Sequence, residues 1–232
     1  MLQDIDKIVR ITAEVVKSTH LPVTVKTRLG WDDKTRNIEE VAERLQDIGV
    51  AALSIHGRTR SQLYKGDADW TLIARVKNNP RIKIPIFGNG DIDTPQKALE
   101  YKDRYGVDGI MIGRAAIGYP WIFREIAHFL ATGTHLPPPE TREVQAWLTE
   151  HLRDHYALYG EDAGVRSARK HIGWAVRALP GGEAFRAAMN TLDDCEAQLR
   201  AVTTFFEALA DTHRLLPSTP PAANQDALAQ QA

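Results

Sequence analysis

The sequence predicts an α/β fold for residues 1–132, followed by an all-α bundle. Three observations support this prediction. Four short apolar segments are each followed by a segment of helical periodicity up to about residue 132. Each apolar segment ends in polar or glycine residues, as strands do where a site lies at one edge of a parallel sheet. From residue 141 onward, helical periodicity continues without a convincing strand.

The composition is that of a soluble globular protein. The chain has 232 residues, of which 43% are hydrophobic and 25% charged, enough for one large or two modest domains. A net charge of −1 excludes a basic field over the whole molecule, so a nucleic-acid contact requires a local basic patch. The single cysteine, Cys195, excludes an internal disulfide and is typical of a reducing cytoplasm. Because no apolar stretch approaches the roughly 18 residues of a membrane span, we expect a cytoplasmic protein without membrane contact.

Periodicity and turn residues define the expected elements. In chain order they are helix 5–16, strand 21–31, helix 37–49, strand 50–60, helix 70–78, strand 84–92, helix 94–106, strand 107–118 and helix 119–133. Gly49 closes the second helix, while Thr94 and Pro95 are expected as the N-cap and first residue of the fourth. The chain thus contains four strand–helix units.

Such an alternation predicts parallel strands, in a doubly wound sheet or a (β/α)8 TIM barrel. A site at one edge is expected, because every strand has polar or glycine residues at its carboxyl end. These residues are Lys26 and Arg28, then His56, then Asn89, Gly90 and Asp91, and finally Gly113 and Arg114. A whole barrel needs roughly 250 residues. We therefore expect the C-terminal half of a TIM barrel (four βα units), with its other half before Met1 and two unpaired sheet edges.

The predicted domain organisation has four parts. Residues 1–132 form the partial barrel, and the proline-rich segment 133–140 is a linker. Residues 141–216 form the helical bundle. Residues 217–232 are rich in Pro, Ala and Gln and are expected to be a disordered tail.

The last two strands end in turns suited to phosphate. The segments "GNGD" and "IGRAA" follow them, at the place where barrel loops commonly bind phosphate with backbone N–H groups. Arg114 can add a bidentate charge. A tight turn without a ligand is the alternative for each glycine. At the preceding strand ends, Lys26 can stabilise negative charge on an electron-accepting ring and His56 can donate to a ring carbonyl, or both are ordinary strand-end side chains.

A basic stripe lies on the predicted helix "VRSARKHIGWAVR", residues 165–177. At 100° per residue its cations fall on one side and its apolar residues on the other. The cations are Arg166, Arg169, Lys170 and Arg177. A solvated helix face is the common alternative, but this local concentration favours contact with a phosphate backbone.

Other candidate groups are weaker. His151 and His155 have the i, i+4 spacing of a metal clamp but lack a third ligand, so no metal site is expected. Cys195 follows two aspartates, which raise a thiol pKa, and is a poor nucleophile. Three tryptophans are expected to be packing residues of amphipathic helices; they are Trp121, Trp147 and Trp174.

Five segments together resemble the tRNA-dihydrouridine synthases, most closely their bacterial B-type branch. In chain order these are "VTVKTRLGW", "SIHGRTR", "GNGDI", "MIGRAAIGYPWIF" and "ARKH", and the resemblance runs from about residue 5 to 214. It implies an FMN-binding barrel followed by a helical tRNA-binding domain. It also implies NADPH as the reductant, hydride transfer from reduced FMN to C6 of a tRNA uracil, and protonation of C5 by a cysteine acid. The base must leave the stack for this chemistry.

The resemblance also implies residue roles. Lys26 and His56 should contact the flavin ring. The FMN phosphate should be held by Asn89, Gly90, Asp91, Gly113 and Arg114. Arg28 and Arg58 should face the substrate side of the site. The tRNA phosphates should meet Arg166, Arg169 and Lys170.

The catalytic cysteine of the family lies in a "GCP" loop that is expected upstream of Met1. Cys195 does not align with it, so no catalytic residue is assigned, and the isolated chain is expected to bind FMN poorly and to be inactive. A separate chain that supplies the missing half barrel is the partner this expectation implies. Two alternatives remain open: a non-catalytic tRNA-binding protein of the same family, and an unrelated phosphate-binding (β/α)8 enzyme.

Overall fold

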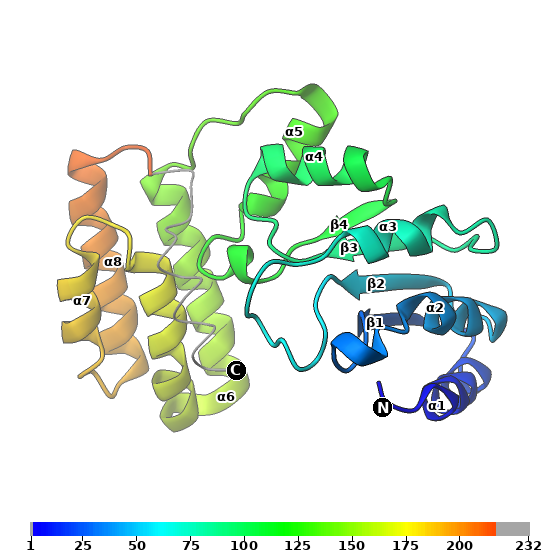
Figure 1. Cartoon of the computed structure of the whole chain (residues 1–232). Helices are drawn as coiled ribbons and strands as arrows, with labels where there is room; N and C mark the ends of the chain where they lie inside the picture. The colour runs from blue at the N-terminus through cyan, green and yellow to red at the C-terminus, as the bar shows by residue number, and fades with distance from the viewer. Residues whose placement is uncertain (1, 217–232) are drawn as a thin grey trace. The chain divides into compact units, whose positions relative to one another are not determined.

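The computed structural model describes residues 2–216, and its chain divides between Gly113 and Arg114 into two compact units (Figure 1). The expected tail at 217–232 lies outside the described residues. The expected linker at 133–140 stays a prediction, and in this division the helix preceding it belongs to the second unit. None of the described helices combines the length and the apolar character that a membrane span requires.

The first unit contains a four-stranded sheet of order β1-β2-β3-β4, with every pairing parallel. Its elements are α1 (Ile5–Ser18), β1 (Thr24–Arg28), η1 (Asp33–Thr35), α2 (Ile38–Asp47), β2 (Ala52–His56), α3 (Thr71–Asn78), β3 (Ile86–Asn89), α4 (Pro95–Tyr105) and β4 (Gly109–Met111). The four predicted strands and their parallel pairing are confirmed. Thr94 caps α4 by accepting from the backbone N–H of Lys97, and Pro95 occupies its first turn, as expected.

The sheet register aligns the carboxyl ends of the strands. Arg28 pairs with His56, His56 with Asn89, and Asn89 with Met111. Because side chains alternate between the two faces of a strand, Lys26 projects from the same face of β1 as Arg28. The predicted site residues of the first three strands therefore share one edge.

Trp70 is the centre of the packing between the sheet and its helices. It is 1% exposed, and its ring lies 5.0 Å from that of Tyr101 and 5.7 Å from that of Tyr105, both on α4. Its indole Nε1 donates to the carbonyl of Gly90 at 3.0 Å, directly after β3. The turn that follows β3 is thus tied to the hydrophobic core.

The outer elements of this unit are less covered. The sheet ends at β1 and β4, so each pairs with one strand only. Helix α1 is amphipathic but contains no fully buried residue, and Ile11 and Val15 are 42% and 47% exposed. Within residues 2–216, β1 and β4 are the outer strands, and the expectation that both edges stay unpaired remains a prediction.

The second unit is helical. Its elements are η2 (Arg114–Ala116), α5 (Ile122–Thr132), α6 (Thr141–Val176), α7 (Gly182–Met189) and α8 (Cys195–Thr212). Helix α6 is interrupted at Gly160, whose φ of 75° and ψ of 176° are not helical. Both segments of α6 pack with α7 and α8 around a core that includes Leu148, Ile172 and Phe206 (Figure 1).

Replacing Gly88 by Ala tests the packing of Trp70. A Cβ at Gly88 would lie 2.0 Å from Cζ3 of the Trp70 ring, which the surrounding core holds rigidly. We expect the substitution to lower the free energy of unfolding by about 1–3 kcal/mol, the usual cost of overpacking. Urea denaturation followed by circular dichroism measures this change.

Gly113→Ala is the matched control, because a Cβ at Gly113 meets nothing within 4 Å. Equal stability of both variants would contradict the predicted role of the Trp70 contact.

Candidate functional site

The candidate site of the first unit lies at the carboxyl edge of the sheet and is built around His56. This side chain ends β2 and is 5% exposed. Burial is the largest cause that lowers the pKa of His56 to about 3, followed by the positive charges of Arg28, Arg58 and Lys26. At neutral pH the imidazole is therefore uncharged.

The tautomer of His56 follows from its neighbour. Nη1 of Arg58 lies 3.3 Å from Nε2 of His56. Because a guanidinium carries donors only, Nε2 must accept in this contact, and the ring proton resides on Nδ1. His56 therefore carries one N–H, at Nδ1, and its predicted donation to a ring carbonyl stays a prediction.

Arg58 forms a buried ion pair with Asp91. Its guanidinium is 2% exposed and donates to both carboxylate oxygens, Nη1 to Oδ1 at 2.8 Å and Nη2 to Oδ2 at 2.7 Å. The same group donates to the carbonyls of Lys65 and Gly66. The predicted substrate contact of Arg58 stays a prediction, and this geometry does not favour it, because its donors are used inside the fold.

Asp91 is equally committed to the loop 57–69. Besides Arg58, it accepts from the backbone N–H of Ala68 at 2.8 Å, and its own backbone is left-handed with φ of 58°. Its carboxylate therefore holds the turn after β3 in position, while any phosphate contact from this segment would use backbone N–H groups.

The neighbouring residues of the Asn-Gly-Asp turn are also packed closely. Gly90 has φ of +130°, and a Cβ there would lie 2.5 Å from Cβ of Ala68 and 3.2 Å from Cδ2 of His56. The amide nitrogen of Asn89 donates to the carbonyl of Met111 at 2.7 Å. The glycine is required by the close approach of the 57–69 loop, which the sequence alone did not indicate.

Lys26 and Arg28 add positive charge at the same edge. Nη1 of Arg28 donates to the carbonyls of Thr59 and Leu63 at 2.9 and 2.8 Å, and the guanidinium lies 5.7 Å from the ring centroid of Tyr64. Lys26 is exposed, yet its pKa is lowered. Partial burial of its ammonium group is the larger cause, and repulsion from Arg28 is the smaller one. Lys26 is thus the member of this group most open to a ligand.

The segment that sequence reasoning missed is the loop 57–69. It supplies the carbonyl acceptors for both arginines and also Tyr64, whose ring centroid is 6.2 Å from that of His56. Its signal was present in "HGRTR", where Arg58 stands two residues beyond a buried histidine. The remaining predicted residues, Gly113 and Arg114, lie two and three residues after the end of β4, and Arg114 begins η2.

In the second unit, the basic stripe is present but is altered by one ion pair. Val165, Ala168 and Ile172 are buried, whereas Arg166 and Lys170 are exposed, as the periodicity predicted. Arg169 is only partly exposed, and its Nη2 donates to Asp193 at 2.6 Å and to the carbonyl of Leu192 at 3.0 Å. Arg169 therefore also anchors the connection between α7 and α8, and its contact with tRNA stays a prediction.

Two weaker candidates lie in the helical unit. The rings of His151 and His155 are 6.2 Å apart, but no group of three or more His, Cys, Asp or Glu within residues 2–216 is arranged to hold a metal ion. The pKa of Cys195 is raised, first by burial and then by Glu161 and Asp194, so its thiol is a weak nucleophile at neutral pH.

Comparison with known proteins identifies the family. The model of the dihydrouridine synthase (Dus) family matches residues 1–210. The chain belongs to this family. The resemblance stated from the sequence motifs is confirmed, and so is the fold, which combines four parallel strands and flanking helices with a helical second part.

The curated relatives are tRNA-dihydrouridine synthase B proteins. The one from Pseudomonas aeruginosa is 48% identical over 206 residues, which is 89% of this chain and 61% of the relative. Those of Xanthomonas campestris and Escherichia coli are 47% and 44% identical, over 90% of this chain and 62% and 65% of the relatives. The chain thus spans somewhat under two thirds of their length.

A solved structure of a mutant mandelate oxidase with 3,3,3-trifluoro-2,2-dihydroxypropanoic acid is also similar. It is 16% identical, with a TM-score of 0.30, over 88% of this chain and 66% of that chain. Nothing is inferred from a likeness at this level.

Asp91→Asn tests whether the buried ion pair holds the site together. Asparagine tolerates the left-handed backbone, so the change removes charge with little strain. It leaves the buried Arg58 unpaired, and we expect a loss of about 3–5 kcal/mol of unfolding free energy in chemical denaturation.

Asp93→Asn is the control. Asp93 pairs with Lys97 at 3.7 Å where both side chains are about 30% exposed, and such a pair contributes about 1 kcal/mol or less. A loss at Asp91 no larger than that at Asp93 would show that the buried pair does not stabilise the turn.

Proposed function

We propose that this chain carries part of the machinery of an FMN- and NADPH-dependent tRNA-dihydrouridine synthase, a cytoplasmic oxidoreductase that reduces uridine in tRNA to 5,6-dihydrouridine. The observation that carries the proposal is the family match over residues 1–210. Because the chain spans about 61% of the P. aeruginosa relative, the activity of the whole protein is part of the proposal.

The residues at the carboxyl edge of the sheet are chemically suited to a flavin nucleotide. Lys26, Arg28 and Arg58 act as positive charges on the uncharged His56, and among residues 2–216 Asp91 is the opposing charge that acts on it. A cationic edge attracts a phosphorylated, electron-accepting ring. When bound and reduced, FMN would supply the hydride for the uracil ring.

The residues of this chain would orient the flavin and stabilise charge on it. Lys26 would lie against the ring and offset negative charge, while Nδ1–H of His56 would donate to a ring carbonyl. The phosphate would be bound by backbone N–H groups of Asn89, Gly90 and Gly113. The space beside Gly113 is open, since a Cβ there would meet nothing within 4 Å.

The remaining phosphate-side and substrate-side roles are proposed in the same way. Arg114 would add a bidentate charge to the phosphate, and Asp91 would act by holding its turn through Arg58. Arg28 would face the substrate, although two of its hydrogen bonds hold it to the 57–69 loop. In the helical unit, Arg166, Arg169 and Lys170 would meet tRNA phosphates.

A non-catalytic tRNA-binding protein is the second candidate, and one observation favours it. The only cysteine of these 232 residues, Cys195, begins α8 in the helical unit and does not align with the family's cysteine, so it is not proposed to protonate C5 of the base. In the catalytic proposal that acid would come from a segment outside these 232 residues.

A turnover assay separates these two candidates. The purified 232-residue chain, supplied with FMN, NADPH and unmodified tRNA, is expected to form no dihydrouridine above background, because it lacks the acid and half the flavin pocket. Mass spectrometry of digested tRNA measures the product, with the full-length P. aeruginosa relative as positive control. Robust product formation by the chain alone would refute the expected inactivity, whereas tRNA affinity without turnover favours the non-catalytic candidate.

The salt dependence of tRNA binding tests the basic stripe. Removing two phosphate contacts by the double substitution Arg166→Ala and Lys170→Ala should weaken binding and lower the slope of log K against log salt by about 1.5–2. Fluorescence anisotropy with labelled tRNA at several salt concentrations measures both quantities.

The matched control is the double substitution Arg142→Ala and Arg153→Ala, which removes the same charge from exposed positions of α6. An equal loss of slope in both variants would mean that tRNA senses only total charge and that the stripe is not the contact surface.

A further inference from the structure

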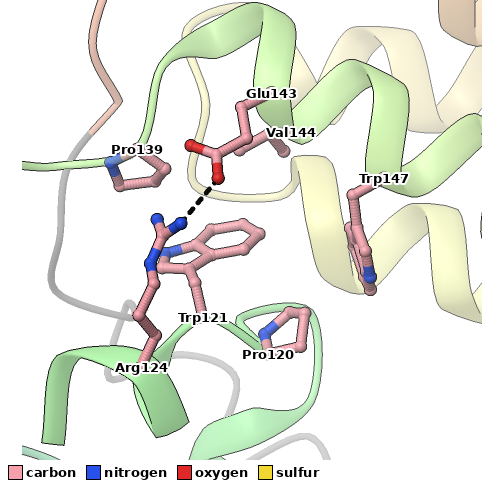
Figure 2. A pocket seen from close by; sticks show the side chains of 7 residues that line it. All are labelled: Pro120, Trp121, Arg124, Pro139, Glu143, Val144 and Trp147. Carbon is pink, nitrogen blue, oxygen red and sulfur yellow. Dashed lines mark hydrogen bonds and ion pairs between the residues drawn. The ribbon is translucent and has the colours of Figure 1, made fainter. Parts of the chain in front are cut away.

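A small cavity in the helical unit has no role in the reaction described above. Its volume is about 290 Å³, and it lies where the segment before α5 meets the start of α6 (Figure 2). It is lined by Pro120, Trp121, Arg124, Pro139, Glu143, Val144 and Trp147. This volume is near the lower limit of small-ligand pockets. It suits a single ring system and is too small for a helix of a partner protein.

The walls of the cavity are flat and apolar. Trp121 and Trp147 are in edge contact, with ring centroids 5.9 Å apart and an interplanar angle of 86°. Two prolines complete the walls (Figure 2). Trp121 is the N-cap residue of α5, and its side chain packs against the helical core, as expected of a packing residue. Indole and proline surfaces of this kind favour a planar, partly apolar ligand.

The polar groups of the cavity form a donor and an acceptor side by side. Nη1 of Arg124 donates to Oε1 of Glu143 at 2.7 Å, and both side chains are about half exposed. The hydrogen bond from Arg124 lowers the pKa of Glu143, so the carboxylate is charged at neutral pH. Oε2 of Glu143 takes no part in that bond, and the guanidinium has further donors.

A third polar group at the cavity is a buried donor that lacks a hydrogen-bond acceptor among residues 2–216. This donor is Nε1 of Trp121. A buried N–H of this kind is unfavourable unless something accepts from it. Since Trp121 lines the cavity, a ligand with a carbonyl oxygen could satisfy this donor.

An aromatic series connects the cavity to the basic stripe. Trp147 stacks on His151 at 5.8 Å, His151 lies 5.2 Å from His171, and His171 lies 5.2 Å from Trp174. The ammonium group of Lys170 lies 5.8 Å from the Trp174 ring. Cations beside aromatic rings are the surface that binds unpaired nucleotides, because phosphate and base are both recognised.

We propose that this cavity binds a single unpaired guanine base of RNA. The inference rests on the proposed tRNA function and assigns it a base-specific contact outside the reduction site. The base would stack in the tryptophan- and proline-lined space, its O6 would accept from Arg124 or Trp121, and Glu143 would accept from its ring N–H and amino group.

Guanine fits this set of groups better than the other bases. A carboxylate only accepts hydrogen bonds, and guanine presents two adjacent donors, N1–H and N2–H, beside the acceptor O6. Uracil presents one donor between two acceptors, while adenine and cytosine each place one donor beside an unprotonated ring nitrogen. Each of these bases would donate at most one hydrogen bond to Glu143.

Quenching of tryptophan fluorescence by nucleoside monophosphates tests the proposal on the 232-residue chain without FMN or reductant. GMP is expected to bind about tenfold more tightly than AMP, CMP or UMP, the discrimination typical of one bidentate base contact. Guanosine should bind about as well as GMP, because the base rather than the phosphate is recognised. Binding governed by the phosphate, with guanosine inactive, would overturn the proposal.

Three variants locate the site. Glu143→Gln should abolish the preference for GMP, and Trp147→Leu should remove saturable quenching. Glu150→Gln is the matched control, an exposed glutamate on the same helix but outside the cavity lining, and should behave as the unaltered chain. Circular dichroism checks that each variant is folded, and loss of the GMP preference in Glu150→Gln as well would contradict the assignment to this cavity.

This experiment is separable from the tRNA proposal. If the chain binds tRNA but shows equal affinity for all four nucleotides, or no saturable quenching, the guanine site is wrong and tRNA binding stands. If GMP binds as expected and tRNA does not, the base site stands and the proposed function fails.

Discussion

The buried ion pair between Arg58 and Asp91 is the constraint on which the candidate site depends. One carboxylate receives two bonds from the guanidinium and one from the backbone of Ala68. Through these bonds the loop after β2 and the turn after β3 hold each other in place. The pair also positions Nη1 of Arg58 against His56, so the tautomer of the imidazole depends on it. Removing one partner of a buried ion pair destabilises the fold strongly, because the other partner is left as an uncompensated buried charge.

The sequence predicted the elements of the fold well because their signals are local. Apolar segments, Thr94 with Pro95, and the glycine after the second helix each act on neighbouring residues, and all appear in the structure. The partners of Arg58 could not be predicted in this way. Asp91 is 33 residues away, and no local pattern in either segment indicates that the two side chains pair. Gly90 is similar: its sequence context is typical of a phosphate turn, yet the contact that requires glycine is with Ala68.

The sequence predicted which side of α6 carries the cations, but it did not predict which of them form ion pairs within the fold. Arg166, Arg169 and Lys170 fall on the polar side of α6, as the 100° periodicity requires. Whether a cation on the helix stays exposed depends on which other segments of the chain pack beside it. The connection between α7 and α8 brings Asp193 to Arg169 and leaves Arg166 and Lys170 exposed. The cavity beside Trp147 was beyond prediction for the same reason, since it requires residues 120–124 to meet residues 139–147.

The charge balance at the sheet edge explains why a neutral histidine suits this position. The Asp91 carboxylate is bound by Arg58, and Arg28 donates to the backbone carbonyls of Thr59 and Leu63 instead. Burial, together with the field of the two arginines and Lys26, lowers the pKa of His56 to about 3. A protonated histidine here would add a further cation to a buried group already rich in them. The neutral form instead offers one N–H at Nδ1 while the lysine carries the charge, which divides hydrogen bonding and electrostatic stabilisation between two side chains.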